Sequence, residues 1–550
     1  MKNARLLFLF GFVMLFIGTW QESAITGKDE FWVTMRTPME MIEDHSYWTL
    51  RLNDEVRLQK PPLIYWFMTL CYQTLGIHLW SARLVGVLSG AGMATITALF
   101  HQRLFKRSGF WAGIAVLATA GVAVEGRRAM LDMPLGFFSL LCVYLALAAY
   151  QDRKHYLYAC SGIALAAATL SKGPQSLLFA VPALLIAYAL LPQKPSGKSL
   201  ILPAILFSTC FLVLTVPWPL SMRILHADFI AELETQIVGN RLSKVSIKSP
   251  FNALGGAMLL VFPWSFILLT GLFISFKKTT ENKRNHKALW LSLWLMSSIL
   301  PFFFMRSFER YMIPILPCAS MIIVWTLDQL RPLPRRALLM LSTFLLSLVA
   351  VVLALFGLWF ELSFWSSLFT LGLVLWMLWT ACHKNATYKP LIGAVWVFTF
   401  SLGILYPQFE VNKIPNDLPW EELQTHPVGI YSQYSQPAML SMRLQRSVDF
   451  PFEERLVNNG YNGYIFTTHD QFDDPERVDT LSYALRSANI PFEVVGEYPV
   501  FFSRRNWIKF TRPDAGRSDW FTAIQKRDLS GLKSSVVYVK TGDLTLQPPK

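Results

Sequence analysis

Fourteen apolar runs of near-spanning length fill the first 407 residues of the chain. A helix of about 20 apolar residues crosses the hydrocarbon core of a bilayer, so a chain with this many runs has few other ways to bury them. The 53% hydrophobic content and the mean hydropathy of +0.37 agree, and the sequence predicts a polytopic α-helical membrane protein. The runs lie at 5–20, 62–77, 80–103, 110–125, 132–150, 156–171, 174–192, 199–220, 252–276, 287–305, 311–328, 336–359, 363–382 and 388–407.

The charges between the runs indicate which runs cross the membrane. If all fourteen crossed, the charge pattern would fall out of register. If instead the run at 62–77 lies at the membrane surface, about 13 helices cross and six loops on the side of the N-terminus are all basic, as expected of cytoplasmic loops. The first run ends in "TWQESA", a poor cleavage site, and is predicted to remain as an uncleaved span. The six loops read "HQRLFKRSG", "QDRKH", "QKPSGK", "KKTTENKRNHK", "QLRPLPRR" and "HKNATYK".

From about residue 408 the pattern changes. The stretches "HPVGIYSQY", "NGYIFTTHD" and "SSVVYVKTG" predict short strands, and "DPERVDTLSYALRSA" predicts a helix. We therefore expect a transmembrane domain at 1–407 and a small soluble α/β domain at 408–550 on the outer face, opposite the basic loops. Residues 408–550 hold 16 Lys and Arg against 18 Asp and Glu, so the net charge of +14 comes from the membrane part and does not predict a nucleic acid partner.

Charged side chains of both signs gather on the predicted outer face, in the loops 21–61 and 221–251 and at the ends of spans. The orientation of the protein does not require cations there, which favours a functional interpretation. Together these charges predict an anionic, amphiphilic substrate, and a phosphate linked to a lipid fits best. The candidate carboxylates are Asp29, Glu30 and Asp132, and the candidate cations are Lys60, Lys172, Arg241, Arg306 and Arg310.

Each of these groups also has a structural interpretation when it is taken alone. The pair Asp29 and Glu30 can accept a proton from an attacking hydroxyl or bind sugar hydroxyls, but it is also typical of a solvated helix cap. Lys60 precedes two prolines that begin a helix, where an ammonium suits a lipid phosphate, and an interfacial lysine beside aromatic anchors gives the same pattern. Asp132 can cap the helix that Pro134 opens, and the remaining cations can be solvated ends of spans.

Other chemistries find little support in the sequence. The chain has no Walker lysine loop and no GxGxxG, HExxH or GxSxG motif, and its nine His residues are scattered. Its six Cys residues lie in or beside apolar runs and offer no CxxC metal site or disulfide framework. The sequence therefore predicts no resident cofactor.

The order of the motifs resembles that of bacterial membrane glycosyltransferases of the GT-C superfamily, most of all the aminoarabinose lipid A transferases and the protein O-mannosyltransferases. An acidic pair follows the first span, a KPP motif comes about thirty residues later, and an Asp at the start of an outer-face helix and a "KG" turn follow. The likeness runs through the membrane half. It is carried by "DE" 29–30, "QKPPLIYW" 59–66, "LDMP" 131–134, "SKGP" 171–174, "NR" 240–241, "PFNALGGAMLLVFPW" 250–264 and "ERYMIPILP" 309–317.

The resemblance implies a transferase in the bacterial inner membrane that takes a sugar from a polyprenyl-phosphate donor on the periplasmic face. The N-terminus would be cytoplasmic and the C-terminal domain periplasmic. Asp29 would be the catalytic acidic residue with Glu30 beside it, Lys60 would contact the donor phosphate, and Arg241 would match an arginine of the large outer loop. The implied acceptor is lipid A or another cell-envelope glycolipid.

Two positions depart from the aminoarabinose transferases. Where those enzymes carry a Glu before the lysine and a His three residues before the arginine, this chain has Gln59 and Val238. Both family residues are associated with metal coordination, so a divalent metal is not supported here. A protein Ser or Thr acceptor and a non-catalytic binder or flippase of lipid-linked sugars are the alternatives. The spans are nearly free of mid-membrane charge, which favours an interfacial enzyme over a flippase.

Overall fold

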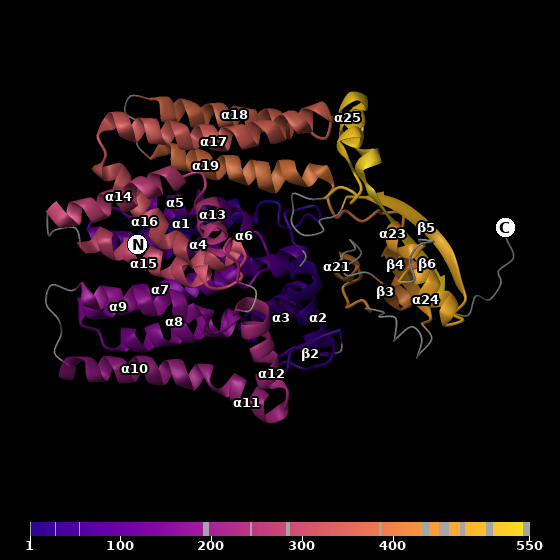
Figure 1. Cartoon of the computed structure of the whole chain (residues 1–550), viewed down its shortest axis with the longest axis horizontal. Helices are drawn as coiled ribbons and strands as arrows, with labels where there is room; N and C mark the ends of the chain where they lie inside the picture. The colour runs from indigo at the N-terminus through magenta and orange to yellow at the C-terminus, as the bar shows by residue number, and fades with distance from the viewer. Residues whose placement is uncertain are drawn as a thin grey trace.

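A bundle of long helices with a β-sheet beyond one end makes up the computed structural model of the chain (Figure 1). We call this end of the bundle the sheet end and the other the opposite end. The described residues are 2–27, 29–53, 55–190, 197–242, 245–281, 286–383, 388–431, 439–449, 461–473, 479–501 and 510–542.

Seven helical segments in the described part of the chain are long and apolar enough to cross a membrane, or eight if a bent pair counts as one span. Shorter apolar helices belong to the same bundle, so the predicted polytopic helical architecture is confirmed. The helices of the bundle are α1 (Lys2–Phe16), α4 (Leu79–Phe105), α5 (Phe110–Leu117), α6 (Ala120–Glu125), α7 (Asp132–Asp152), α8 (Tyr156–Lys172), α9 (Leu177–Ala189), α10 (Gly197–Thr215), α13 (Ser249–Val261), α14 (Ser265–Glu281), α15 (His286–Ile299), α16 (Leu316–Gln329), α17 (Pro332–Trp359), α18 (Phe364–Cys382) and α19 (Lys389–Phe400).

The fourth and the ninth predicted run are each broken into two helices, α5 with α6 and α13 with α14, and the second pair is bent by 110°. Pro263 explains the second break, because proline has no N–H to donate within a helix. Interrupted backbone at membrane depth needs partners inside the protein, and the two breaks supply them to each other. The N–H of Ala120 donates to the carbonyl of Phe262 over 2.8 Å, and the indole of Trp264 donates to the carbonyl of Ala118 over 2.8 Å.

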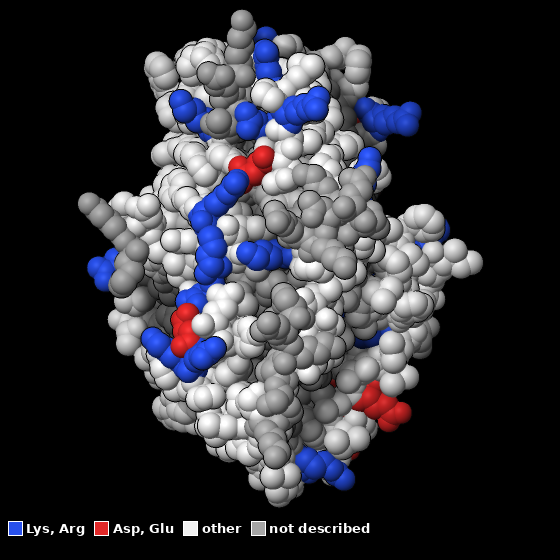
Figure 2. Space-filling view, turned by 90° about the vertical axis from the view of Figure 1, so that its left-hand side faces the viewer, with Lys and Arg blue, Asp and Glu red and all other residues white. Residues whose placement is uncertain are grey.

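Lys and Arg side chains gather at the opposite end of the bundle, which Figure 2 shows face on with few Asp and Glu among them. Asp328 ties two of the predicted basic loops together, because it accepts a hydrogen bond from Tyr388 and lies 3.7 Å from Nη1 of Arg107. Arg103 pairs with Asp152 over 2.8 Å and joins a third loop. The loops at 101–109, 151–155, 329–336 and 383–389 thus lie close together, as the charge pattern predicts. The parts of the predicted basic loops at 191–196, 282–285 and 384–387 lie outside the described residues.

The sheet has four strands in the order β3-β4-β6-β5, with β3 and β4 parallel and the other pairs antiparallel. Three strands and the helix α24 fall where the sequence predicts them, although 432–434 and 474–478 of those stretches lie outside the described residues. The strand β5 was not predicted, because Gly496 and Pro499 interrupt it; a proline is tolerated in an edge strand such as this one. The elements are β3 (Val428–Ile430), β4 (Gly463–Thr468), β5 (Phe492–Val500), β6 (Ser534–Thr541) and α24 (Leu481–Ser487).

The sheet shares a hydrophobic core with the loop region between α1 and α4. Two helices of that region, α2 (Arg36–Glu43) and α3 (Leu63–Leu75), bury Met39 and Tyr65 in the same cluster as Phe466 of β4 and Val536 of β6. The short hairpin of β1 (Arg51–Leu52) and β2 (Glu55–Val56) lies between them in the chain. The run at 62–77 therefore packs at the sheet end instead of standing among the long helices (Figure 1).

Candidate functional site

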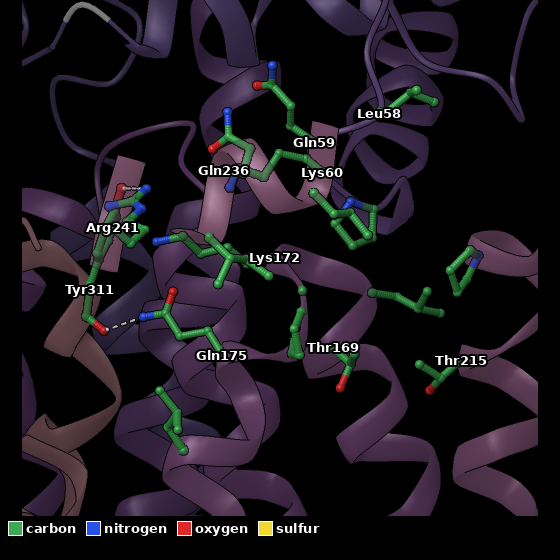
Figure 3. Close-up of a pocket in the computed structure, with 18 of the residues that line it drawn as sticks. Leu58, Gln59, Lys60, Thr169, Lys172, Gln175, Thr215, Gln236, Arg241 and Tyr311 are labelled. Carbon is green, nitrogen blue, oxygen red and sulfur yellow. Dashed lines mark hydrogen bonds between the residues drawn. The ribbon is translucent and has the colours of Figure 1, made fainter. Parts of the chain in front are cut away.

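A cavity of about 370 Å³ lies at the sheet end of the bundle (Figure 3). Its walls come from the chain before α3, the turn between α8 and α9, the segment from α11 (Pro217–Leu225) through α12 (Phe229–Glu234) to η3 (Thr235–Leu242), and the chain between Phe302 and Tyr311. Most of the lining is apolar. The apolar side chains include Leu58, Leu170, Trp218, Phe229, Leu233 and Phe302.

Three cations reach this cavity from separate segments of the chain: Lys60, Lys172 and Arg241 (Figure 3). Lys60 lies just before the proline pair that begins α3. Lys172 is the last residue of α8, which ends because Gly173 follows with φ of +110°, a conformation that other residues rarely adopt. Arg241 lies near the end of η3. The structure thus brings together three of the five cations that the sequence predicts for phosphate binding.

Tyr311 organises two of these cations, and sequence reasoning missed it. The ammonium of Lys172 lies 3.6 Å from the centre of its ring, and the guanidinium carbon of Arg241 lies 4.7 Å from the same centre. Arg241 also donates a hydrogen bond to the phenol oxygen over 2.7 Å. Aromatic rings attract cations through their electron-rich faces, so Tyr311 holds two positive charges side by side. The sequence feature that could have identified Tyr311 is its position directly after the candidate cation Arg310 in "FERY".

A chain of ion pairs runs beside the cavity. Asp29 pairs with Arg310, Arg310 also lies 3.8 Å from Asp132, and Asp132 pairs with Lys172. Asp132 and Lys172 are buried, whereas the side chain of Asp29 is 48% exposed. The predicted convergence of carboxylates and cations from distant parts of the chain is therefore present. Arg310 and Asp132 do not line the cavity themselves and are connected to it by the ion pair of Asp132 with Lys172.

Glu30 is not among the residues that line the cavity and belongs to a separate network. Its side chain is fully buried, accepts hydrogen bonds from Thr26 over 2.7 Å and from the N–H of Ala129 over 2.9 Å, and pairs with Arg83 over 3.0 Å and Arg128 over 3.6 Å. Burial raises the pKa of Glu30, but the two arginines together with the hydrogen bonds from Ala129 and Thr26 outweigh it and bring the pKa below its ordinary value. Every oxygen of Glu30 is engaged by protein donors, so this carboxylate fixes the loop that carries Asp29.

Arg306 also lies outside the cavity lining. Its side chain is exposed, and its contact with the site is made by the backbone, because its N–H donates to the carbonyl of Arg241 over 3.0 Å. Gln59, which stands where the aminoarabinose transferases carry a Glu, donates a hydrogen bond from its side-chain amide to Glu232 of α12 over 2.6 Å. Among the described residues, no group of three His, Cys, Asp or Glu side chains is close enough to hold a metal ion.

Lys60 lies in an electrostatic environment that disfavours its charge. Burial first, and then the positive charges of Lys172 and Arg57, lower the pKa of Lys60 to about 7. The described lining thus carries three cations and no Asp or Glu, and of the three Lys172 pairs with a nearby carboxylate, that of Asp132. An anion placed among the three cations relieves their mutual repulsion, and the apolar walls beside them suit a hydrocarbon chain.

Comparison with known proteins gives partial matches in sequence and a match over nearly the whole chain in structure. The family model for dolichyl-phosphate-mannose-protein mannosyltransferases matches residues 59–220. An uncharacterized protein from Aquifex aeolicus (strain VF5) is 28% identical over 145 residues, which are 26% of this chain and only 29% of that protein.

Two solved structures of ArnT from Cupriavidus metallidurans superpose on nearly the whole chain with a TM-score of 0.70 at 16% identity. The apo form covers 97% of both chains, and the form bound to undecaprenyl phosphate covers 99% of both. The chain therefore has this fold, and it resembles the GT-C superfamily to which the aminoarabinose transferases and the mannosyltransferases belong.

Proposed function

We propose that this chain, a polytopic helical protein of the GT-C type, transfers a sugar from a polyprenyl-phosphate donor to an acceptor at the sheet end of the bundle. The observation that carries the proposal is the cavity itself, in which Lys60, Lys172 and Arg241 line one part of a largely apolar space. A lipid phosphate combines an anion with a hydrocarbon chain. The undecaprenyl phosphate bound to the ArnT structure belongs to this class.

The roles of the residues follow from the charge that the reaction develops. Breaking the bond between the sugar and the phosphate leaves negative charge on the phosphate, and Lys60 and Arg241 stabilise it in a partly desolvated site. Lys172, held by Asp132 and Tyr311, supplies the third cation. The half-exposed carboxylate of Asp29 faces the acceptor and accepts its proton or orients it. Direct attack then inverts the anomeric carbon.

The proposed acceptor is lipid A or another cell-envelope glycolipid. The likeness to ArnT over the whole chain, including the sheet, supports it. A protein acceptor is the second candidate, and the family match over residues 59–220 supports that one. Mass spectrometry of lipid A, surface glycans and envelope proteins from cells with and without the gene separates them, because only one class loses a sugar.

The proposed orientation places the basic end of the bundle in the cytoplasm and the cavity and sheet on the periplasmic side of the bacterial inner membrane, with about 13 crossings. The gathering of the basic loops at one end supports this orientation (Figure 2). A cysteine introduced at the exposed position 248 would then react with a membrane-impermeant maleimide in intact spheroplasts. Labelling that appears only after lysis would show that the protein has the opposite orientation.

Replacing Lys60 by alanine tests the function. In proteoliposomes supplied with undecaprenyl-phosphate sugar, we expect Lys60→Ala to lower the rate of undecaprenyl phosphate release by about 10²–10³-fold, the usual effect of removing one group that stabilises developing negative charge. Lys248→Ala removes an exposed cation near the same end of the bundle and is the matched control. A rate for Lys60→Ala equal to that of the control would end the proposal.

The depressed pKa of Lys60 predicts a pH dependence of donor binding. Below pH 7 the side chain is a cation that attracts phosphate, and above pH 7 it becomes neutral, so affinity for undecaprenyl phosphate should fall as the pH rises from 6 to 8.5. The ligand's own ionisation changes over the same range, and Lys60→Arg isolates the protein's part because arginine stays charged. Calorimetric titration should show a smaller loss of affinity for Lys60→Arg. Equal slopes for the two proteins would contradict the prediction.

A further inference from the structure

The helix α25 (Arg517–Lys526) follows the strand β5 in the chain but packs on the helical bundle (Figure 1). Its Ala523, together with Leu529 just beyond the helix, belongs to the hydrophobic cluster of the bundle helices, not to the one that the sheet shares with α2 and α3. Trp520 meets Phe356 of α17 edge to face, with ring centres 6.3 Å apart. The chain thus leaves the sheet, docks one helix on the bundle and returns to the sheet as β6.

The contacts of α25 fix its height relative to a membrane. The indole of Trp359, the last residue of α17, donates to the carbonyl of Ile524 over 2.9 Å, and Arg527 lies over the same indole with 4.5 Å between guanidinium carbon and ring centre. The 28 residues of α17 extend about 42 Å, more than the roughly 30 Å of a hydrocarbon core. In a bilayer crossed by α17, Trp359 would therefore lie at the level of the lipid headgroups, where tryptophan is enriched.

The helix α25 lies across the ends of α17 and α18 (Figure 1). It therefore runs along the plane of a membrane that α17 crosses. On the face not covered by the bundle, Phe521 is 63% exposed and Ile524 is 45% exposed. These residues are three apart and so share one side of the helix. Trp365, at the start of α18, is also 76% exposed.

Cations flank this apolar pair at both ends of the helix. Arg517 begins α25 and Lys526 ends it, both exposed, and neither has an ionic partner within 4.0 Å among the described residues. The segment 510–533 holds five basic residues against three acidic ones. Aromatic and aliphatic side chains between lysine and arginine are typical of helices that lie in a membrane interface.

We propose that α25 is an interfacial membrane anchor, which inserts Phe521 and Ile524 into the headgroup layer of the bilayer at the sheet end while Arg517 and Lys526 contact lipid phosphates. The partner is the phospholipid surface itself. The docking of α25 at the end of α17, which is long and apolar enough to cross a membrane, favours a bilayer over a second protein chain. The anchor is independent of the transfer chemistry, because α25 contributes no residue to the cavity lining.

Site-directed spin labelling of the full chain tests the proposal in vesicles of phosphatidylethanolamine and phosphatidylglycerol. Labels at Phe521→Cys and Ile524→Cys are expected to collide with oxygen more often than with a water-soluble nickel complex. Controls at Thr522→Cys on the same helix and Tyr483→Cys on α24 should show the reverse. All four positions are exposed, so labelling disturbs no core contact. The three native cysteines that are at least partly exposed are replaced first: Cys160, Cys210 and Cys382.

Labels at 521 and 524 that report water, as the control at 483 does, would overturn the anchor. Spin–spin broadening between copies at these two positions would overturn it as well, because it would assign the face to a second chain. A second measurement needs no cysteine: hydrogen exchange of residues 517–526 in nanodiscs. We expect faster exchange in the Phe521→Asp, Ile524→Asp double variant and unchanged exchange in Thr522→Asp. Equal exchange in both would refute the proposal.

Discussion

Asp29→Asn is expected to lower the rate of sugar transfer by about 10²–10⁴-fold, the range for removing a group that moves a proton in the transition state. Asparagine keeps the shape of the side chain and can still accept from Arg310, so the ion-pair chain beside the cavity loses a charge but not its geometry. The affinity for undecaprenyl phosphate should change little, because Asp29 does not line the cavity. Single-turnover kinetics and a binding titration separate the two quantities.

The matched control for this variant is Asp44→Asn, which neutralises another exposed carboxylate of the same outer loop. Its transfer rate should equal that of the unchanged protein. A transfer rate for Asp29→Asn within a few-fold of the control would remove Asp29 from the chemistry. A weaker affinity for undecaprenyl phosphate in Asp29→Asn would instead assign the residue to donor binding.

Arg83→Met is expected to destabilise the fold more than any other single change considered, by about 3–5 kcal/mol in the free energy of unfolding, because it leaves the buried Glu30 carboxylate short of a counter-charge. Arg83 and Glu30 are both fully buried and meet over 3.0 Å. The same arginine donates to the carbonyls of Thr19 and Gln21, just beyond the first helix. Reversible unfolding of the purified protein in detergent measures the change.

A double-mutant cycle with Glu30→Gln distinguishes the pair from its surroundings. The combined variant should lose less stability than the sum of the two single variants, because neither partner is then left with an uncompensated charge. Strict additivity would show that the two side chains do not depend on each other. Arg103→Ala, which breaks the more exposed pair with Asp152 at the opposite end, should have a much smaller effect.

The polytopic helical architecture was predictable because the length of the apolar runs reports it directly. The sequence could not show that Pro263 and the chain near Ala118 interrupt two spans, since the hydrogen bonds that make those breaks tolerable join residues over 140 positions apart. The strand β5 was missed for a local reason, because its glycine and proline weaken the alternation that identifies a strand. Its pairing with β6 supplies the stabilisation that its composition does not.

The site was predictable only as a set of charges. Lys60 and Lys172 lie in motifs with a recognisable context, and both line the cavity. The adjacent carboxylates Asp29 and Glu30 look equivalent in sequence, yet one is half exposed and the other fully buried. The difference comes from Arg83, which pairs with Glu30 inside the protein. Because Arg83 lies within the apolar run at 80–103, the sequence predicted it only as part of a span. When the partner of a buried charge is distant in sequence, the residues next to that charge do not reveal the pairing.

The core that the sheet shares with α2 and α3 limits how this protein can be cut or recombined. Truncating the chain after residue 407 would expose the buried side chains of Met39 and Tyr65 to solvent. The separated C-terminal fragment would in turn expose Phe466 and Val536. Chimeras that exchange the C-terminal region between relatives should therefore express only when residues 29–72 are exchanged together with it. The practical unit of modular exchange is thus two segments far apart in the gene, not one tail.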